Sequence, residues 1–93
     1  MLNLNDLRVF LAAAETENFS VAARRLHLSQ PAVSQHIQAL ERELGIALFH
    51  RQGRQVKLTE AGQVLMPLAH DLLAHSCRVE ETMRSLGGEL VGV

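Results

Sequence analysis

The sequence contains very few aromatic residues and a single cysteine. Three of its 93 residues are Phe and none is Trp or Tyr, although 47% are hydrophobic. The core must therefore be built from Leu, Ala, Val and Ile, a composition that favours helices. Cys77 alone excludes an internal disulfide and a cysteine-based metal cluster. No apolar run is long enough to cross a bilayer, so we expect a cytoplasmic protein with no membrane partner.

The sequence also lacks the patterns of an enzyme or a metal site. Its five histidines show no tight metal-ligand spacing, and His70 and His75 are too far apart in sequence to share one helix face well. There is no Ser/His/Asp set and no glycine-rich phosphate loop. We therefore predict no catalytic residues, no metal site and no cofactor within these residues. A chain of this length forms one domain, or one domain and a tail.

Positive charge is concentrated in the middle of the sequence. The formal net charge is −1, which by itself argues against binding to nucleic acid. Residues 20–58, however, contain six Lys or Arg and only two Glu, while both flanking segments are acidic. This distribution favours a DNA-facing surface that is confined to the middle of the chain.

Residues 19–44 predict two helices joined by a tight turn at 27–29. Ser29 is suited to cap the second helix, Pro31 to its first turn and Gly45 to its end. The apolar face of this second helix consists of Val33, Ile37, Leu40 and Leu44. The opposite face is polar and consists of Pro31, Ser34, Gln35, Gln38 and Arg42. This pattern is typical of a helix-turn-helix that reads a DNA major groove, although the polar residues also suit an ordinary solvated surface.

A further helix is expected before this motif, with an apolar stripe that covers it. The stripe consists of Leu4, Leu7, Phe10, Leu11 and Ala14. Asn3 or Asn5 is suited to cap this first helix. Ser20 is the expected N-cap of the next helix, and its hydroxyl is alternatively a phosphate contact. Arg24 and Arg25 are expected on the solvent side of that helix, and a contact of one of them with the DNA backbone is the alternative to a solvated charge.

Residues 50–58 predict a two-stranded hairpin with Gly53 at its tip. Three apolar residues before it are expected to return to the core: Ile46, Leu48 and Phe49. The basic side chains of the hairpin indicate a wing that touches DNA, with Arg54 in a minor groove and Arg51 and Lys57 on phosphates. Each of these side chains is also compatible with a solvated charge.

Thr59 and Glu60 predict the start of a final, long helix. Its apolar positions step by four and three: Ala61, Leu65, Leu68, Leu72, Val79, Met83 and Leu86, with His75 in the same seam. A domain of this size does not need so long a helix for its own core, so we expect the same helix of a second copy as its partner. The expected dimer contact consists of Leu65, Leu68, Leu72, His75 and Val79. Pro67 is expected to bend this helix, and Gly87-Gly88 to end it before a strand-like segment.

Six short groups of residues stand in a characteristic order. They are Leu7-x-x-Phe10; Phe19-Ser20-x-Ala22-Ala23-x-x-Leu26; Leu28-Ser29-Gln30-Pro31-Ala32-Val33-Ser34; Ile37-x-x-Leu40-Glu41; Leu44-Gly45-x-x-Leu48-Phe49-x-Arg51; and Leu58-Thr59-x-Ala61-Gly62. Each group is weak alone. Together, over residues 4–62, the groups closely resemble the N-terminal DNA-binding domain of LysR-type bacterial transcription regulators.

The resemblance implies a mainly α fold. Three helices and a short β-hairpin would form a winged helix-turn-helix over residues 1–58, and a dimerising linker helix would follow over residues 59–86. Residues 87–93 would be a hinge and the start of a C-terminal effector-binding domain. That domain, with its small-molecule effector, would lie beyond these 93 residues, and tetramers are common among the full-length members.

The resemblance also implies roles for individual residues. Those expected to contact DNA are Ser20, Ser29, Gln30, Pro31, Ala32, Ser34, Gln35, Gln38, Arg51 and Arg54. Of these, Gln30, Pro31, Ser34 and Gln35 would meet base edges, Ser29 and Arg51 would meet phosphates, and Arg54 would reach a minor groove. Many relatives have Arg in place of Gln35. Because Gln favours adenine and Arg favours guanine, the target sequence should differ at that point.

The sequence therefore predicts the sequence-specific DNA-binding domain of a homodimeric bacterial transcription regulator. Its partners would be double-stranded DNA and a second copy of the chain, and its target an interrupted near-palindrome. The alternative is a dimeric helical adaptor whose polar face binds another protein. A gel shift with promoter DNA distinguishes the two.

Overall fold

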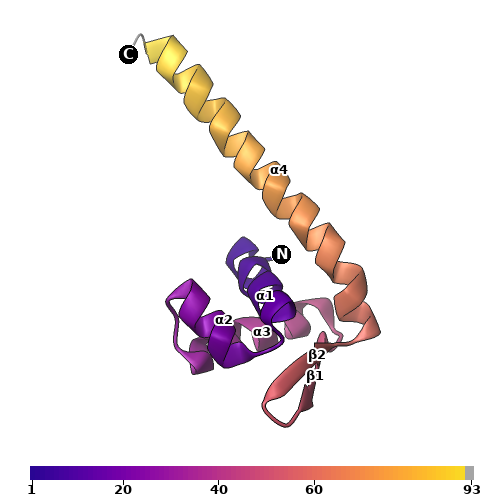
Figure 1. Cartoon of the computed structure of the whole chain (residues 1–93). Helices are drawn as coiled ribbons and strands as arrows, with labels where there is room; N and C mark the ends of the chain where they lie inside the picture. Colours follow the sequence, from indigo (N-terminus) through magenta and orange to yellow (C-terminus); the bar gives the residue numbers. More distant parts are fainter. Residues whose placement is uncertain (92–93) are drawn as a thin grey trace.

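The computed structural model describes residues 1–91. They form the predicted mainly helical winged helix-turn-helix, followed by one long helix (Figure 1). The elements in chain order are α1 (Leu4–Thr16), α2 (Phe19–Leu26), α3 (Gln30–Leu44), β1 (Phe49–Gln52), β2 (Gln55–Leu58) and α4 (Glu60–Val91). None of the described helices combines the length and the apolar character that a bilayer crossing requires.

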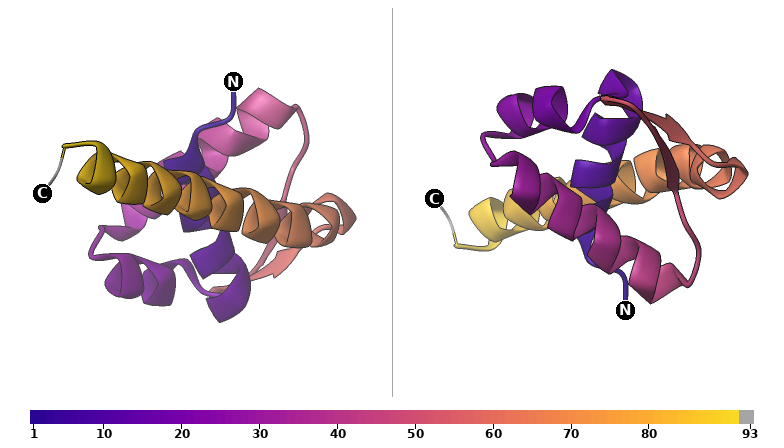
Figure 2. Two further views of the ribbon diagram at one scale, coloured as in Figure 1. Left: turned by 90° about the horizontal axis from the view of Figure 1, so that it is seen from above. Right: turned by 90° about the horizontal axis from the view of Figure 1, so that it is seen from below.

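Helix α1 is the central element of the domain. It packs against α2, α3, α4 and β2, and Figure 2 shows α4 running across the helical domain. Because α1 has neighbours on most sides, it buries more than the single predicted stripe: Leu7, Val9, Phe10, Leu11, Ala12, Ala13 and Ala14. Leu4 was expected in that stripe, but it is 37% exposed because it begins the helix at the edge of this packing.

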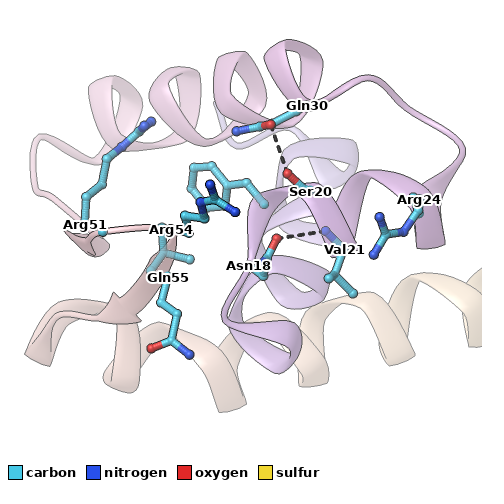
Figure 3. A pocket seen from close by; sticks show the side chains of 11 residues that line it. Asn18, Ser20, Val21, Arg24, Gln30, Arg51, Arg54 and Gln55 are labelled. Atoms are coloured by element: carbon cyan, nitrogen blue, oxygen red, sulfur yellow. Dashed lines mark hydrogen bonds between the residues drawn. The ribbon is translucent and has the colours of Figure 1, made fainter.

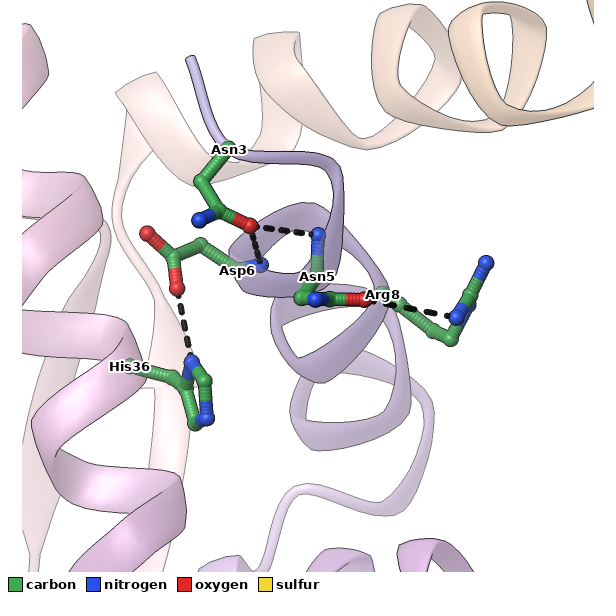
Figure 4. Close-up of polar contacts among 5 residues, drawn as sticks. All are labelled: Asn3, Asn5, Asp6, Arg8 and His36. Carbon is green, nitrogen blue, oxygen red and sulfur yellow. Dashed lines mark hydrogen bonds and ion pairs between the residues drawn. The ribbon is translucent and has the colours of Figure 1, made fainter. Parts of the chain in front are cut away.

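Side-chain caps begin the helices of the domain. The Asn3 carboxamide oxygen accepts from the backbone N–H of Asn5 over 2.8 Å at the start of α1 (Figure 4). The Ser29 hydroxyl caps α3 as predicted, accepting from Ala32 over 3.2 Å. Helix α2 is capped by Asn18, so the prediction that Ser20 is its N-cap is wrong. Asn and Ser are about equally good caps, so the backbone decides between them. An N-cap residue has an extended backbone, and here that residue is Asn18.

The apolar back of α3 is buried except at its end. Val33, Ile37 and Leu40 are buried, whereas Leu44 is 38% exposed and Ile46 is 53% exposed. The expectation that Ile46 returns to the core is therefore wrong, and Leu44 lies at the edge of the packed face. The reason is that the end of α3 projects beyond the other helices of the domain (Figure 2). The core resumes at Leu48, which is fully buried.

The hairpin is anchored to the corner between α1 and α2. Strands β1 and β2 pair antiparallel, with Phe49 opposite Leu58. Gly53 turns the chain at the tip with φ +61°, a conformation that favours glycine. Val56 is buried, and its backbone N–H donates to the Glu17 carbonyl oxygen over 3.0 Å. This hydrogen bond fixes the wing next to the start of α2.

Helix α4 begins in close contact with the segment that precedes the wing. The Thr59 hydroxyl accepts from the backbone N–H of Gly62 over 3.1 Å, which confirms the predicted cap. The hydroxyl also donates to the Ala47 carbonyl oxygen over 2.7 Å. These bonds set the direction in which α4 leaves the domain.

Helix α4 continues further than the sequence suggested. It is uninterrupted at Pro67, and it passes through Gly87 and Gly88 to Val91. The expectation that the two glycines end the helix is therefore wrong. A glycine in a helix interior costs about 1 kcal/mol relative to Ala, which is not enough to stop a helix with many formed turns before it. The predicted strand falls partly on α4 and partly on residues 92–93, which lie outside the described residues.

Candidate nucleic-acid interface

Helix α3 presents a polar front on the side opposite its buried back. Gln30, Pro31, Gln35 and Gln38 are exposed on this helix, and Ala32 and Ser34 are half-buried. The predicted division into an apolar back and a polar front is thus present in the structure. Because the front offers amides and a hydroxyl, it can exchange hydrogen bonds with a polar surface such as base edges.

The first residue of this front is held by α2. The Ser20 hydroxyl donates to the side-chain oxygen Oε1 of Gln30 over 2.9 Å (Figure 3). A serine hydroxyl has one proton, and this bond uses it. While the bond is in place, Ser20 cannot donate to a phosphate, which is the role that the sequence suggested as an alternative to capping.

Arg51 joins the wing to the middle of the front. Its Nη2 donates to the Ser34 hydroxyl oxygen over 3.2 Å, and its guanidinium carbon lies 5.4 Å from the centroid of the Phe19 ring. Phe19 meets Phe49 edge-on at a centroid distance of 5.5 Å, and Phe49 lies 5.6 Å from Phe10. All three phenylalanines of the chain therefore form one row, from the core to the face on which Arg51 stacks.

A cleft of about 520 Å³ lies between the start of α2, the start of α3 and the wing. Arg24 enters its lining from α2, and Arg51 and Arg54 from the wing (Figure 3). Among the described residues that line the cleft, none carries a carboxylate. Three cations around one open, acid-free cleft attract a polyanion such as a DNA backbone. The sequence suggested the DNA backbone as an alternative contact for one of Arg24 and Arg25, but it did not indicate which, because the position of Arg24 beside the wing depends on tertiary packing.

Two other basic side chains near the cleft are paired with acids. Arg25 contacts Glu15 over 3.0 Å, and the Lys57 ammonium contacts the Glu17 carboxylate. Within residues 1–91, Arg24, Arg51 and Arg54 form no such ion pair. Three cations without an ion pair thus lie together at the cleft. Lys57, which the sequence suggested as a phosphate contact, instead holds the wing to Glu17.

Helix α4 exposes the residues predicted for the dimer contact. Leu68 is 59% exposed, Leu72 is 40% exposed and Val79 is 50% exposed. The His75 ring nitrogen Nδ1 lies 3.2 Å from Arg78 Nη2. Leu65 differs from these residues because it packs against the core of its own domain.

Comparisons with known proteins place this geometry in one family. A family model described as a bacterial regulatory helix-turn-helix protein of the lysR family matches residues 4–63. A transcriptional regulator of helix-turn-helix type from the ibpB-leuC intergenic region of Azotobacter vinelandii is 46% identical over 91 residues, which is 98% of this chain and 63% of the relative. The regulator TfdT of Cupriavidus pinatubonensis is 43% identical over 96% of this chain and 41% of its own length. The chain thus spans less than two thirds of these curated relatives.

A solved structure shows the same fold bound to DNA. The crystal structure of a CbnR DBD–DNA complex superposes with a TM-score of 0.88 at 36% identity, covering 92% of this chain and 99% of that one. The residues matched by the family model include the helix-turn-helix, the wing and the start of the long helix. The chain belongs to the LysR family of bacterial regulatory helix-turn-helix proteins.

Proposed function

We propose that this chain is the sequence-specific DNA-binding domain of a bacterial transcription regulator. The observation that carries the proposal is the position of the uncharged polar front of α3 next to a cleft lined by three arginines and no acid. Base edges require hydrogen-bonding groups and phosphates require cations, and here the two occur side by side. The similarity to a domain whose crystal structure was solved in complex with DNA supports the proposal.

In this proposal α3 enters a major groove and the wing lies along the neighbouring minor groove. Gln35 and Gln38 reach base edges from the exposed part of the front, with Pro31 against a sugar or a thymine methyl. Arg24 and Arg51 hold the backbone that passes between the two grooves, and Arg54, next to the wing tip, reaches into the minor groove.

Two copies of the domain are expected to bind together. The exposed apolar residues of α4 need a partner, and the equivalent helix of a second copy supplies a self-complementary surface. A symmetric pair of reading helices implies an interrupted near-palindrome as the target. We expect the regulator to act in the cytoplasm, where bacterial promoters are. Its small-molecule effector would bind outside these 93 residues. The full-length protein is expected to assemble as a dimer or a tetramer.

Selection from a library of random duplexes tests the proposal. The purified chain should enrich a motif with two related half-sites, and its affinity for that motif should fall steeply with salt. Each phosphate contact adds about 0.9 to the slope of the logarithm of affinity against the logarithm of salt concentration. Enrichment of no motif, with equally weak binding to every duplex, would contradict the proposal and favour the protein adaptor.

A further inference from the structure

We propose that Ser20 and Arg51 are positioning residues that set the hydrogen-bond polarity of the recognition helix. Each occupies an acceptor site on a residue of the α3 front, so that Gln30 and Ser34 both present donors to DNA. The inference rests on the proposed function and adds a rule for which bases these two residues read.

The contact between Ser20 and Gln30 fixes one amide. A glutamine side chain offers an oxygen that accepts and an NH₂ group that donates. The Ser20 hydroxyl donates to Oε1 over 2.9 Å, and Figure 3 shows the side-chain nitrogen of Gln30 pointing away from Ser20. One lone pair of Oε1 remains, but the group turned away from Ser20 and toward an external partner is the NH₂ donor.

The contact between Arg51 and Ser34 has the same effect on a hydroxyl. A guanidinium group only donates, so the Ser34 oxygen must be the acceptor in this 3.2 Å contact. The Ser34 proton then remains available to donate outward. The ring of Phe19 under the guanidinium restricts its movement and keeps this arrangement in place.

These two donors restrict the bases that can be read. A glutamine that recognises adenine in the usual way uses its oxygen to accept from N6 and its nitrogen to donate to N7. This contact is disfavoured for Gln30 while Ser20 holds its oxygen, because Oε1 keeps a second lone pair but is turned toward Ser20. Its NH₂ group instead suits edges that offer acceptors, namely guanine O6 and N7 or thymine O4. Gln35 makes no side-chain hydrogen bond within the described residues, so the two-bond contact with adenine is left to it.

Parallel selections of random duplexes with the wild-type chain and variants test this rule. The base pair whose preference is lost in Gln30→Ala is the one that Gln30 reads, and the wild type should prefer guanine or thymine there. Ser20→Ala should shift that same base pair toward adenine, because Oε1 is then free to turn toward the base edge and accept from it. We expect discrimination against adenine to fall by a factor of about 3 to 10, the range of one hydrogen bond.

Gln35 provides the matched control for Ser20. Ser20→Ala should leave the base pair read by Gln35 unchanged, and it should have no effect on base preference when combined with Gln30→Ala. An unchanged preference at the Gln30 base pair, or an equal loss of affinity for all duplexes, would overturn the role of Ser20. If the wild-type chain selects no motif at all, the proposed function itself fails, and the rule fails with it.

Arg51→Lys tests the second contact, because it keeps the charge on the wing but loses the guanidinium plane. It should alter base preference at the base pair identified with Ser34→Ala. A uniform loss of affinity with no change in preference would show that Arg51 only holds phosphate and does not position Ser34.

Discussion

Helix α4 lies very close to the rest of the domain at Gly62. A Cβ atom at this position would lie 2.4 Å from the carbonyl oxygen of Leu48 and 2.7 Å from Cδ2 of Leu58. The first of these is backbone and the second belongs to a leucine packed against the core, so neither moves aside easily. The direction of α4 therefore depends on the absence of a side chain at this residue.

We predict that Gly62→Ala lowers the free energy of unfolding by about 1–3 kcal/mol, the usual range for overpacking. Urea denaturation followed by circular dichroism measures the change. Gly87→Ala is the matched control, because nothing lies within 4 Å of its Cβ position. It should be neutral or stabilise the helix by up to about 1 kcal/mol. Identical midpoints for Gly62→Ala and the wild type would contradict the close approach.

Local sequence patterns predicted the caps at Ser29 and Thr59 and the buried back of α3, because caps and helical periodicity involve neighbours within four residues. The contacts that shape the site are not local. Asp6 Oδ1 lies 2.7 Å from His36 Nδ1 and joins α1 to α3 across 30 residues (Figure 4). No local sequence pattern indicates a pair so far apart in the chain. Contacts of this kind, which orient the polar front of α3, could therefore not be predicted from the sequence.

At the scale of elements, α2 directs two adjacent arginines to different surroundings. Arg24 lines the cleft beside the wing, whereas Arg25 pairs with Glu15 on α1 over 3.0 Å. One residue along a helix corresponds to a rotation of about 100°, which is enough to separate the two guanidinium groups. The same charge at neighbouring positions thus has two different roles.

We predict that Arg24→Ala weakens binding to all duplexes similarly and reduces the slope of log affinity against log salt by about 1. The reason is the loss of one phosphate contact without loss of a base contact. Fluorescence anisotropy titrations at several salt concentrations measure both quantities. Arg25→Ala removes the same side chain from the neighbouring position and should leave the slope unchanged. Equal slopes for the two variants would show that Arg24 does not contact a DNA phosphate.

The sequence predicted the order and type of the elements better than their ends. Hydrophobic periodicity marks where a helix packs, but the exposed positions of Leu44 and Ile46 depend on how far the neighbouring helices extend. The persistence of α4 through Gly87 and Gly88 has a similar cause. Glycine lowers helix propensity by a fixed amount, while the cooperativity of a long helix is a property of the whole element.

At the scale of the molecule, α4 makes the chain elongated, with extents of 56 × 25 × 19 Å. Away from the face that packs on the core, this helix carries large exposed apolar residues on one side: Leu68, Leu72, Val79, Met83 and Leu86. Such a stripe is unfavourable in water, and its period of about 3.5 residues suits a second helix. We therefore expect the solution state to be a dimer through α4.

We predict that Leu72→Glu combined with Val79→Glu converts this dimer to a monomer, because charged residues cannot be buried between two apolar helices without partners. Sedimentation velocity measures the assembly. His70→Glu adds the same charge at an exposed position on the opposite side of α4 and should leave the dimer intact. A double variant that sediments as the wild type does would show that this face is not the dimer contact.

The most direct test of the central claim, that the front of α3 reads base edges, is the affinity of Gln35→Ala for two duplexes. One contains the motif selected by the wild-type chain and the other has the same composition in scrambled order. We predict a loss of about 5- to 150-fold on the selected duplex, corresponding to about 1–3 kcal/mol, and no change on the scrambled one. Gln63→Ala, at an exposed glutamine of α4, should change neither. An equal loss on both duplexes would contradict the account, because Gln35 would then contribute to affinity without reading sequence.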